Sequence, residues 1–342
     1  MERTKIKAVL LGLGNMGRHH YRYLCASPDF ELVAVVDPTP RHAIVDPSIP
    51  LLSTPEELDR FEFDAAIVAT PTETHTQMVK DLLRKKVHVL VEKPAAANFE
   101  EADMLVKLAR DQEVGLAVGH IERCNPGVDA VASLLDLGVL GMPVHAYALR
   151  CGPYPNAVRP GNQVFLDLAV HELDVLQRLF HKVRVMSGFY HCTREEEIAD
   201  LAEIQLEVGE GIQTLLHVNW LSPRKIRSLK VTGTAGVCEM DYISQSVKLY
   251  GVEASALEES PYQFTPLEDP HCVAFELDIA KVEPIGRQLA EFARLIRGEG
   301  NILCRDFEIL ESLQTLDDCV RKSGASLTPY SAKGWVREKY IN

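Results

Sequence analysis

The sequence has 342 residues, of which 46% are hydrophobic and 25% are charged, so it has the composition of an ordinary globular protein and predicts no disorder. Its 36 lysines and arginines against 49 acidic residues give a net charge of −13, which argues against nucleic acid or an anionic membrane as a partner. The apolar runs are too short for a membrane span, and the start "MERTK" does not resemble a signal peptide, so we expect a cytoplasmic protein.

The eight cysteines are scattered along the chain. They form no C-x-x-C pair, and no group of histidine and cysteine has the spacing of metal ligands. We therefore expect reduced, mostly buried thiols and no bound metal.

Residues 6 to 120 alternate short apolar runs with helical patterns. The runs are KAVLLGLG, ELVAVVD, DAAIVAT, VHVLVEK and VGLAVGH. One of the helices is expected to begin at Asn98, with Glu101 three residues later as in a capping box. Strands that alternate with helices indicate a parallel sheet covered on both faces. We therefore predict an α/β Rossmann domain, with a doubly wound parallel sheet, over residues 1–120.

After residue 120 the pattern changes to one of an α+β domain. A helix is expected from about residue 126 and another over 165–180, followed by several strands separated by short turns and then by helices over 284–297 and 306–322. The turns VGEG and TGTAG are typical of hairpins, so the sheet is predicted to be large and mainly antiparallel. Because the chain exceeds the usual size of one core, we predict that residues 121–342 form a second domain for substrate binding and oligomerisation.

The segment GLGNMG has the G-x-G-x-x-G spacing of a dinucleotide-binding turn, between the first strand and a helix. Asp37 ends the next strand, where a carboxylate can accept hydrogen bonds from an adenosine ribose. Since that carboxylate repels a 2′-phosphate, we predict NAD as the cofactor, although Arg41 would accommodate the phosphate of NADP. The residues expected at the cofactor are Gly12, Gly14, Asn15, Met16, Gly17, Asp37, Thr70, Pro71, His75, Glu92 and Lys93. His75 is explained equally well as the start of a helix.

Three titratable residues stand out as candidates for chemistry. Lys93 follows the strand VHVLVEK at the carboxyl edge of the predicted parallel sheet, where such sheets bind their ligands. Asp167 and His171 are four residues apart on one face of a predicted helix. The alternatives are a solvated strand end for Lys93 and a buried structural pair for Asp167 and His171.

The segments GLGNMG, ATPTETH and EKP, followed by D-x-x-x-H-x-x-D, resemble the Gfo/Idh/MocA family of NAD(P)-dependent sugar and polyol oxidoreductases. The resemblance covers nearly the whole chain. The stretches VGHIERCNP, GPYP, DLAVHELD and NWLSPRKIRSLKVTGTAGVCEMDYI are similar to the branch of the family that oxidises UDP-N-acetylglucosamine at C3. The sequence departs from that pattern at Cys124, where an aromatic residue is expected, at Glu172, where aspartate is usual, and at Ala169, which replaces a glycine.

The resemblance implies oxidation of the 3-hydroxyl of a UDP-sugar, and the residue chemistry agrees. His171 is a natural base for the hydroxyl proton, Lys93 can stabilise alkoxide character, and Asp167 would orient the sugar or the lysine. The substrate is expected to contact Lys93, Arg123, Asn125, Arg159, Asp167 and His171. Arg150, Arg224 and Arg227 are further candidates for a diphosphate, although each arginine is also explained as a surface charge.

Two alternatives remain open on the sequence: a dehydrogenase of another sugar or polyol, such as glucose or inositol, and a regulator that senses NAD without catalysis. Independently of the reaction, the second-domain sheet predicts a homodimer or homotetramer. The apolar alternation indicates a broad surface that needs covering, formed by Ile204, Leu206, Val208, Leu215, His217 and Asn219.

Overall fold

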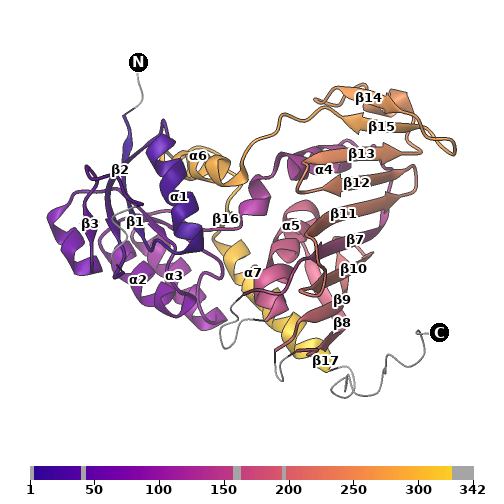
Figure 1. The fold of residues 1–342 in the computed structure, drawn as a ribbon. Coiled ribbons are helices and arrows are strands. Elements are labelled where there is room, and N and C mark those ends of the chain that lie inside the picture. The colour runs from indigo at the N-terminus through magenta and orange to yellow at the C-terminus, as the bar shows by residue number, and fades with distance from the viewer. Residues whose placement is uncertain (1–3, 40–43, 157–162, 195–197, 326–342) are drawn as a thin grey trace, which may run out of the picture. The chain divides into compact units, whose positions relative to one another are not determined.

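The computed structural model describes residues 4–39, 44–156, 163–194 and 198–325, and the chain divides into two compact units (Figure 1). The first unit comprises residues 1–129 and 280–314, and the second comprises residues 130–279 and 315–342. Within the described ranges no helix is both long enough and apolar enough to cross a membrane.

The first unit is built on a seven-stranded sheet in the order β16-β6-β5-β4-β1-β2-β3. All neighbouring strands are parallel except β16, which pairs antiparallel with β6. The strands are β1 (Ile6–Leu11), β2 (Phe30–Val36), β3 (Leu51–Leu52), β4 (Ala65–Val68), β5 (His88–Val91), β6 (Leu116–Val118) and β16 (Cys304–Arg305). This is the doubly wound Rossmann sheet that the alternating pattern predicts.

Helices cover both faces of this sheet. They are α1 (Asn15–Ala26), α2 (Thr72–Arg84), α3 (Phe99–Asp111) and α6 (Pro284–Ile296), with short 3₁₀ helices η1 (Pro55–Arg60) and η2 (Ile121–Cys124). Successive residues of β1 face opposite sides, so Val9 joins a core with α2 and α3, whereas Leu10 joins one with α1 and α6. The predicted cap of α3 is confirmed, because the Asn98 side chain accepts the Glu101 amide at 2.9 Å.

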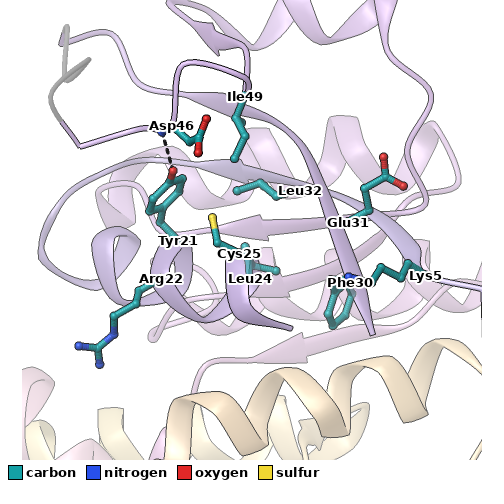
Figure 2. A pocket seen from close by; sticks show the side chains of 10 residues that line it. All are labelled: Lys5, Tyr21, Arg22, Leu24, Cys25, Phe30, Glu31, Leu32, Asp46 and Ile49. Atoms are coloured by element: carbon teal, nitrogen blue, oxygen red, sulfur yellow. Dashed lines mark hydrogen bonds between the residues drawn. The ribbon is translucent and has the colours of Figure 1, made fainter. Parts of the chain in front are cut away.

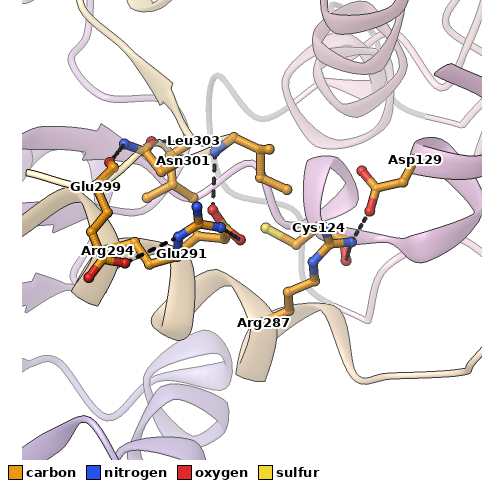
Figure 3. Close-up of polar contacts among 9 residues, drawn as sticks. Cys124, Asp129, Arg287, Glu291, Arg294, Glu299, Asn301 and Leu303 are labelled. Atoms are coloured by element: carbon orange, nitrogen blue, oxygen red, sulfur yellow. Dashed lines mark hydrogen bonds and ion pairs between the residues drawn. The ribbon is translucent and has the colours of Figure 1, made fainter. Parts of the chain in front are cut away.

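Helix α6 belongs to the first unit although it lies far along the chain. Phe292 stacks on Phe30 with ring centroids 6.0 Å apart. Arg287 forms an ion pair with Asp129, at the start of helix α4 (Pro126–Asp136), and Glu291 accepts the Ile302 amide at 3.2 Å (Figure 3). Residues 280–314 therefore pack with residues 1–129 and complete the core on the α1 side of the sheet.

The second unit contains a ten-stranded sheet in the order β14-β15-β13-β12-β11-β7-β10-β9-β8-β17. Its pairings are antiparallel except those of β7 with β10 and β8 with β17. The strands are β7 (Pro143–Cys151), β8 (Val183–His191), β9 (Leu201–Val208), β10 (Ile212–Asn219), β11 (Ile226–Gly233), β12 (Val237–Asp241), β13 (Ser246–Tyr250), β14 (Phe264–Leu267), β15 (Ala274–Leu277) and β17 (Ser323–Ala325). The predicted large, mainly antiparallel sheet is thus confirmed.

Helix α5 (Val170–Phe180) packs on β7, β8 and β9 of this sheet. The second unit also contains most of α4, the helical turn η3 (Phe165–Ala169) before α5, the 3₁₀ helix η4 (Ala254–Leu257) and the C-terminal part of α7 (Phe307–Lys322).

One expectation about the sheet was wrong. Residues 204, 206 and 208 lie on one face of the sheet and residues 215, 217 and 219 lie on the other, because Leu206 pairs with Thr214 and Gln205 pairs with Leu215. Ile204, Leu206 and Val208 are buried, whereas Leu215 is partly exposed. The register set by the turn at Gly209 and Gly211 decides the faces, and alternation within one strand does not reveal it.

Candidate functional site

The glycine loop between β1 and α1 has the backbone shape that a pyrophosphate needs. Gly12 has a φ of +95°, and a Cβ there would lie 2.6 Å from the carbonyl oxygen of Ala69. A Cβ at Gly17 would lie 2.0 Å from the Gly12 oxygen, so both positions require glycine. At Gly14, in contrast, a Cβ would meet no described atom within 4 Å.

The first turn of α1 is open to an anion. Gly14 is its N-cap and supplies no side-chain hydrogen bond, and no acidic residue lies in the first turn. Asn15 is exposed and Met16 is partly exposed in that turn. Backbone N–H groups at the start of a helix, together with its dipole, favour a bound phosphate, so the loop fits the pyrophosphate of a dinucleotide.

Asp37 is fixed to this loop. Its Oδ2 accepts the backbone amide of Leu13 at 2.7 Å, and its Oδ1 accepts the amide of Thr39 at 2.8 Å. Only 7% of the residue is exposed. The carboxylate therefore holds the peptide between the first two glycines in place, a contact that the motif spacing did not reveal.

Strands β1, β4 and β5 are neighbours in the sheet, and the segments that follow them carry most of the predicted cofactor residues. Thr70 and Pro71 follow β4, and Pro71 is the N-cap of α2. Glu92, Lys93 and Pro94 follow β5, with a cis peptide between Lys93 and Pro94. Because carboxyl ends of parallel strands share one edge, these segments lie at the edge where such sheets bind ligands.

His75 lies in the first turn of α2 and is buried. Only 1% of it is exposed, and its Nε2 is 2.9 Å from the carbonyl oxygen of Thr70. Its Nδ1 is 2.8 Å from the carbonyl oxygen of Pro94. Both ring nitrogens thus face backbone acceptors of the protein.

Glu92 is buried beside a second histidine, His20 of α1. The distance from His20 Nε2 to Glu92 Oε1 is 2.7 Å, and the residues are 0% and 7% exposed. The Glu92 amide donates to the Val68 carbonyl at 2.8 Å. Lys93 itself is partly exposed.

Of the predicted substrate residues in the first unit, Arg123 and Asn125 are almost fully buried around η2. Arg123 donates to Glu308 Oε1 at 2.8 Å with 3% of the residue exposed. Asn125 accepts the amide of Gly127 at 3.0 Å. Arg159 and Arg41 lie outside the described residues.

In the second unit, Asp167 lies in a π-helical turn (η3, Phe165–Ala169) that leads into α5, the helix of His171. Both residues are partly exposed. Asp167 Oδ2 accepts a hydrogen bond from the Trp220 indole at 3.0 Å, and Trp220 is 2% exposed. Single π turns inside helices occur frequently at functional sites, so this departure from a regular helix marks the segment as a site candidate.

Glu172, next to His171, joins a buried network. Its Oε1 accepts from Arg150 Nε at 2.6 Å, and its Oε2 accepts from the Tyr242 hydroxyl at 2.8 Å. Glu172 is 0% and Arg150 is 1% exposed. Arg150 is therefore a buried ion-pair partner and not a surface charge, which the sequence alone did not distinguish.

A hollow of about 510 Å³ lies elsewhere in the first unit, beside α1 (Figure 2). Both apolar and charged side chains line it. Burial raises the pKa of Tyr21, whose hydroxyl accepts the Asp46 amide at 2.7 Å. None of the predicted site residues lines it. The lining residues are Lys5, Tyr21, Arg22, Leu24, Cys25, Phe30, Glu31, Leu32, Asp46 and Ile49.

The doubly wound sheet, its glycine loop and the acidic residue after β2 define a dinucleotide-binding protein of the Rossmann class. Residues 6–120 match the model of the Gfo/Idh/MocA oxidoreductase family, NAD-binding Rossmann fold, and residues 128–239 match the C-terminal domain of the same family. The chain belongs to the Gfo/Idh/MocA family of oxidoreductases.

Curated relatives include two dehydrogenases with different substrates. UDP-N-acetylglucosamine 3-dehydrogenase of Acidithiobacillus ferrooxidans is 25% identical over 305 residues, covering 86% of this chain and 90% of the relative. The scyllo-inositol 2-dehydrogenase (NAD(+)) of Bacillus subtilis is 26% identical over 290 residues, covering 80% and 84%.

Solved structures have the same fold. The UDP-N-acetylglucosamine 3-dehydrogenase GnnA from A. ferrooxidans matches with a TM-score of 0.77 at 20% identity, covering 94% of this chain and 98% of that one. KijD10, a 3-ketoreductase from Actinomadura kijaniata in complex with TDP-benzene and NADP, matches with a TM-score of 0.78 at 17% identity, covering 95% and 100%. At these identities the likeness establishes the fold.

Proposed function

We propose that this chain is an NAD-dependent dehydrogenase that oxidises the 3-hydroxyl of UDP-N-acetylglucosamine to the 3-keto sugar nucleotide. The observation that carries the proposal is the position of Lys93, directly after β5 at the ligand-binding edge of a sheet whose glycine loop fits a pyrophosphate. The similarity to the A. ferrooxidans enzyme over 86% of the chain supports the choice of substrate. The product would supply amino-sugar and cell-surface glycan synthesis.

The proposed chemistry needs a base and a group that stabilises negative charge on oxygen. We assign the base to His171 and the stabilising group to Lys93, whose ammonium would donate to the hydroxyl oxygen. Asp167, held by the Trp220 indole, would orient the sugar or the lysine. A bound nicotinamide would supply the hydride acceptor.

NAD is proposed over NADP because Asp37 is buried at the loop and a 2′-phosphate beside its carboxylate would be repelled. We assign cofactor binding to the predicted domain of residues 1–120 and substrate binding to the predicted domain of residues 121–342, although residues 280–314 of the latter pack with the first unit. An enzyme that uses NAD and a UDP-sugar needs a compartment that contains both compounds, and we therefore propose a cytoplasmic location.

A second substrate class, inositol, is favoured by the similarity to the B. subtilis enzyme. Turnover distinguishes the two. With NAD and UDP-N-acetylglucosamine carrying deuterium at C3, the label should appear in NADH. Retention of the label on the sugar, or turnover of scyllo-inositol alone, would exclude the proposed reaction.

We also propose a homodimer or homotetramer built on the second-unit sheet. One face of the sheet offers apolar area for a second copy. It carries Tyr147 and Leu215, which are partly exposed and pair across neighbouring strands, and Lys230 pairs with Tyr147 on the other side. Light scattering at micromolar concentration should give twice or four times the chain mass, and a monomer would refute this.

A further inference from the structure

Lys93 lies between two residues that are each held by a buried histidine. On its N-terminal side, Glu92 faces His20 of α1, with 2.7 Å between Oε1 and Nε2. A carboxylate only accepts hydrogen bonds, so the His20 ring donates. This contact ties the residue before Lys93 to the helix that begins in the glycine loop.

On the C-terminal side, the carbonyl oxygen of Pro94 is held by His75 of α2, with 2.8 Å to Nδ1. The same ring reaches the Thr70 carbonyl at 2.9 Å with Nε2. Carbonyl oxygens only accept, so the ring donates from one nitrogen and packs against the second carbonyl with the other. His75 thereby links the segment after β5 to the segment after β4.

The Glu92 carboxylate has little freedom to leave His20. A Cβ at Gly119 would lie 3.1 Å from both Cδ and Oε2 of Glu92, so the backbone of the segment after β6 packs tightly against it. The Glu92 amide is bonded to the Val68 carbonyl at 2.8 Å. Backbone and side chain of the residue before Lys93 are therefore both fixed.

We propose that His20 and His75 are positioning residues that hold Lys93 for its reaction from two sides. The inference rests on the proposed role of Lys93. His20 lies one turn after Gly17 on α1, whose first turn fits a pyrophosphate. One helix thus serves both the cofactor loop and the placement of the lysine, and neither histidine touches the reacting atoms.

The test compares His20→Ala, His75→Ala and the matched control His19→Ala, an exposed neighbour on the same helix. With NAD and UDP-N-acetylglucosamine, we expect kcat to fall about 10- to 100-fold for the first two variants, because small misplacements of a reacting group have this effect. The control should keep the wild-type kcat. His20→Gln, which retains an N–H donor for Glu92, should recover most of the lost rate and also serves if His20→Ala does not fold.

A double-mutant cycle separates positioning from general destabilisation. In a Lys93→Ala background, His20→Ala and His75→Ala should cause no further loss of kcat, since they act through Lys93. Additive losses, or full activity of both histidine variants while Lys93→Ala is impaired, would overturn the inference.

A second measurement does not depend on the substrate. Amide hydrogen exchange over residues 92–97 should become about tenfold faster or more in His20→Ala and His75→Ala than in wild type and His19→Ala, because loss of the contacts allows local opening. Unchanged exchange would refute the positioning role. If exchange changes as expected but Lys93→Ala is fully active, the proposed function of Lys93 fails and the two histidines serve stability alone.

Discussion

The carboxylate of Asp37 accepts the backbone amide of Leu13 at 2.7 Å, which joins the end of β2 to the middle of the glycine loop. One side chain therefore combines two tasks: it shapes the loop, and in the proposed complex it also meets the adenosine ribose. A substitution at this position changes the loop and the choice of cofactor together.

Asp37→Ala should weaken NAD binding about 10- to 100-fold, because hydrogen bonds to a charged group are worth about 1.5–3 kcal/mol. NADP should lose less affinity, or gain some, since the repulsion of a 2′-phosphate is removed. Fluorescence titration of both cofactors measures this. Tighter binding of NADP than of NAD by the wild-type protein would contradict the proposed preference.

His171→Ala and Lys93→Ala should each lower kcat by about 10²- to 10⁴-fold, the usual cost of losing a positioned acid–base group. NAD affinity should change little, because both groups are proposed to act on the alcohol. Steady-state kinetics and cofactor titration together test this. Weakened NAD binding with lowered thermal stability would instead indicate a structural role.

Local patterns were sufficient for the two kinds of sheet and for the cofactor loop. Each of the successful predictions depends on residues close in sequence. They are the glycine spacing, the cap at Asn98 and the change after residue 120 from alternating strands and helices to an α+β pattern. The partners of the loop and of the site residues could not be predicted in this way. Leu13 meets Asp37 and Phe292 stacks on Phe30 only after strands and helices have packed, and no periodicity encodes such pairs.

The site residues show the same limit. The spacing of Asp167 and His171 indicated a shared helix, but not the π turn or the Trp220 indole that holds Asp167. The sequence did contain one signal for this contact, a tryptophan at the end of the β10 pattern. A buried indole N–H usually donates to an acceptor, and a nearby carboxylate is a candidate.

Trp220→Phe tests this contact, since phenylalanine keeps an aromatic ring against Tyr154 but removes the N–H donor. We expect kcat to fall about tenfold if Asp167 acts as proposed, with an unfolding free energy lowered by about 1 kcal/mol. Kinetics and chemical denaturation measure the two effects. A loss of stability with an unchanged kcat would remove Asp167 from the reaction.

The buried pair of Glu172 and Arg150 predicts a large stability effect. Glu172→Ala leaves the guanidinium buried without this carboxylate and should lower the free energy of unfolding by about 3–5 kcal/mol. Glu239→Ala is the control, because its pair with Lys230 is about half exposed and such pairs contribute about 0–1 kcal/mol. Urea denaturation of both variants compares them, and equal effects would contradict the buried network.

His88 predicts an acid-dependent loss of stability in the first unit. Its Nδ1 accepts the Gly115 amide at 2.9 Å, and burial lowers the pKa of the ring below its usual value of 6.5. Above pH 6.5 the ring is neutral in both folded and unfolded chains. Below it the unfolded chain binds the proton more readily, so stability falls as the pH decreases.

In His88→Asn this contribution is absent. The difference in Tm between wild type and variant should therefore shrink as the pH is lowered from about 7.5 to about 5.5, a range that spans the titration of an unfolded histidine. Exposed His19→Asn, as control, should differ from wild type by the same amount throughout. A difference that stays constant for His88→Asn, or grows toward acid, would show that the ring accepts a proton at least as easily in the folded chain, and that burial does not lower its pKa.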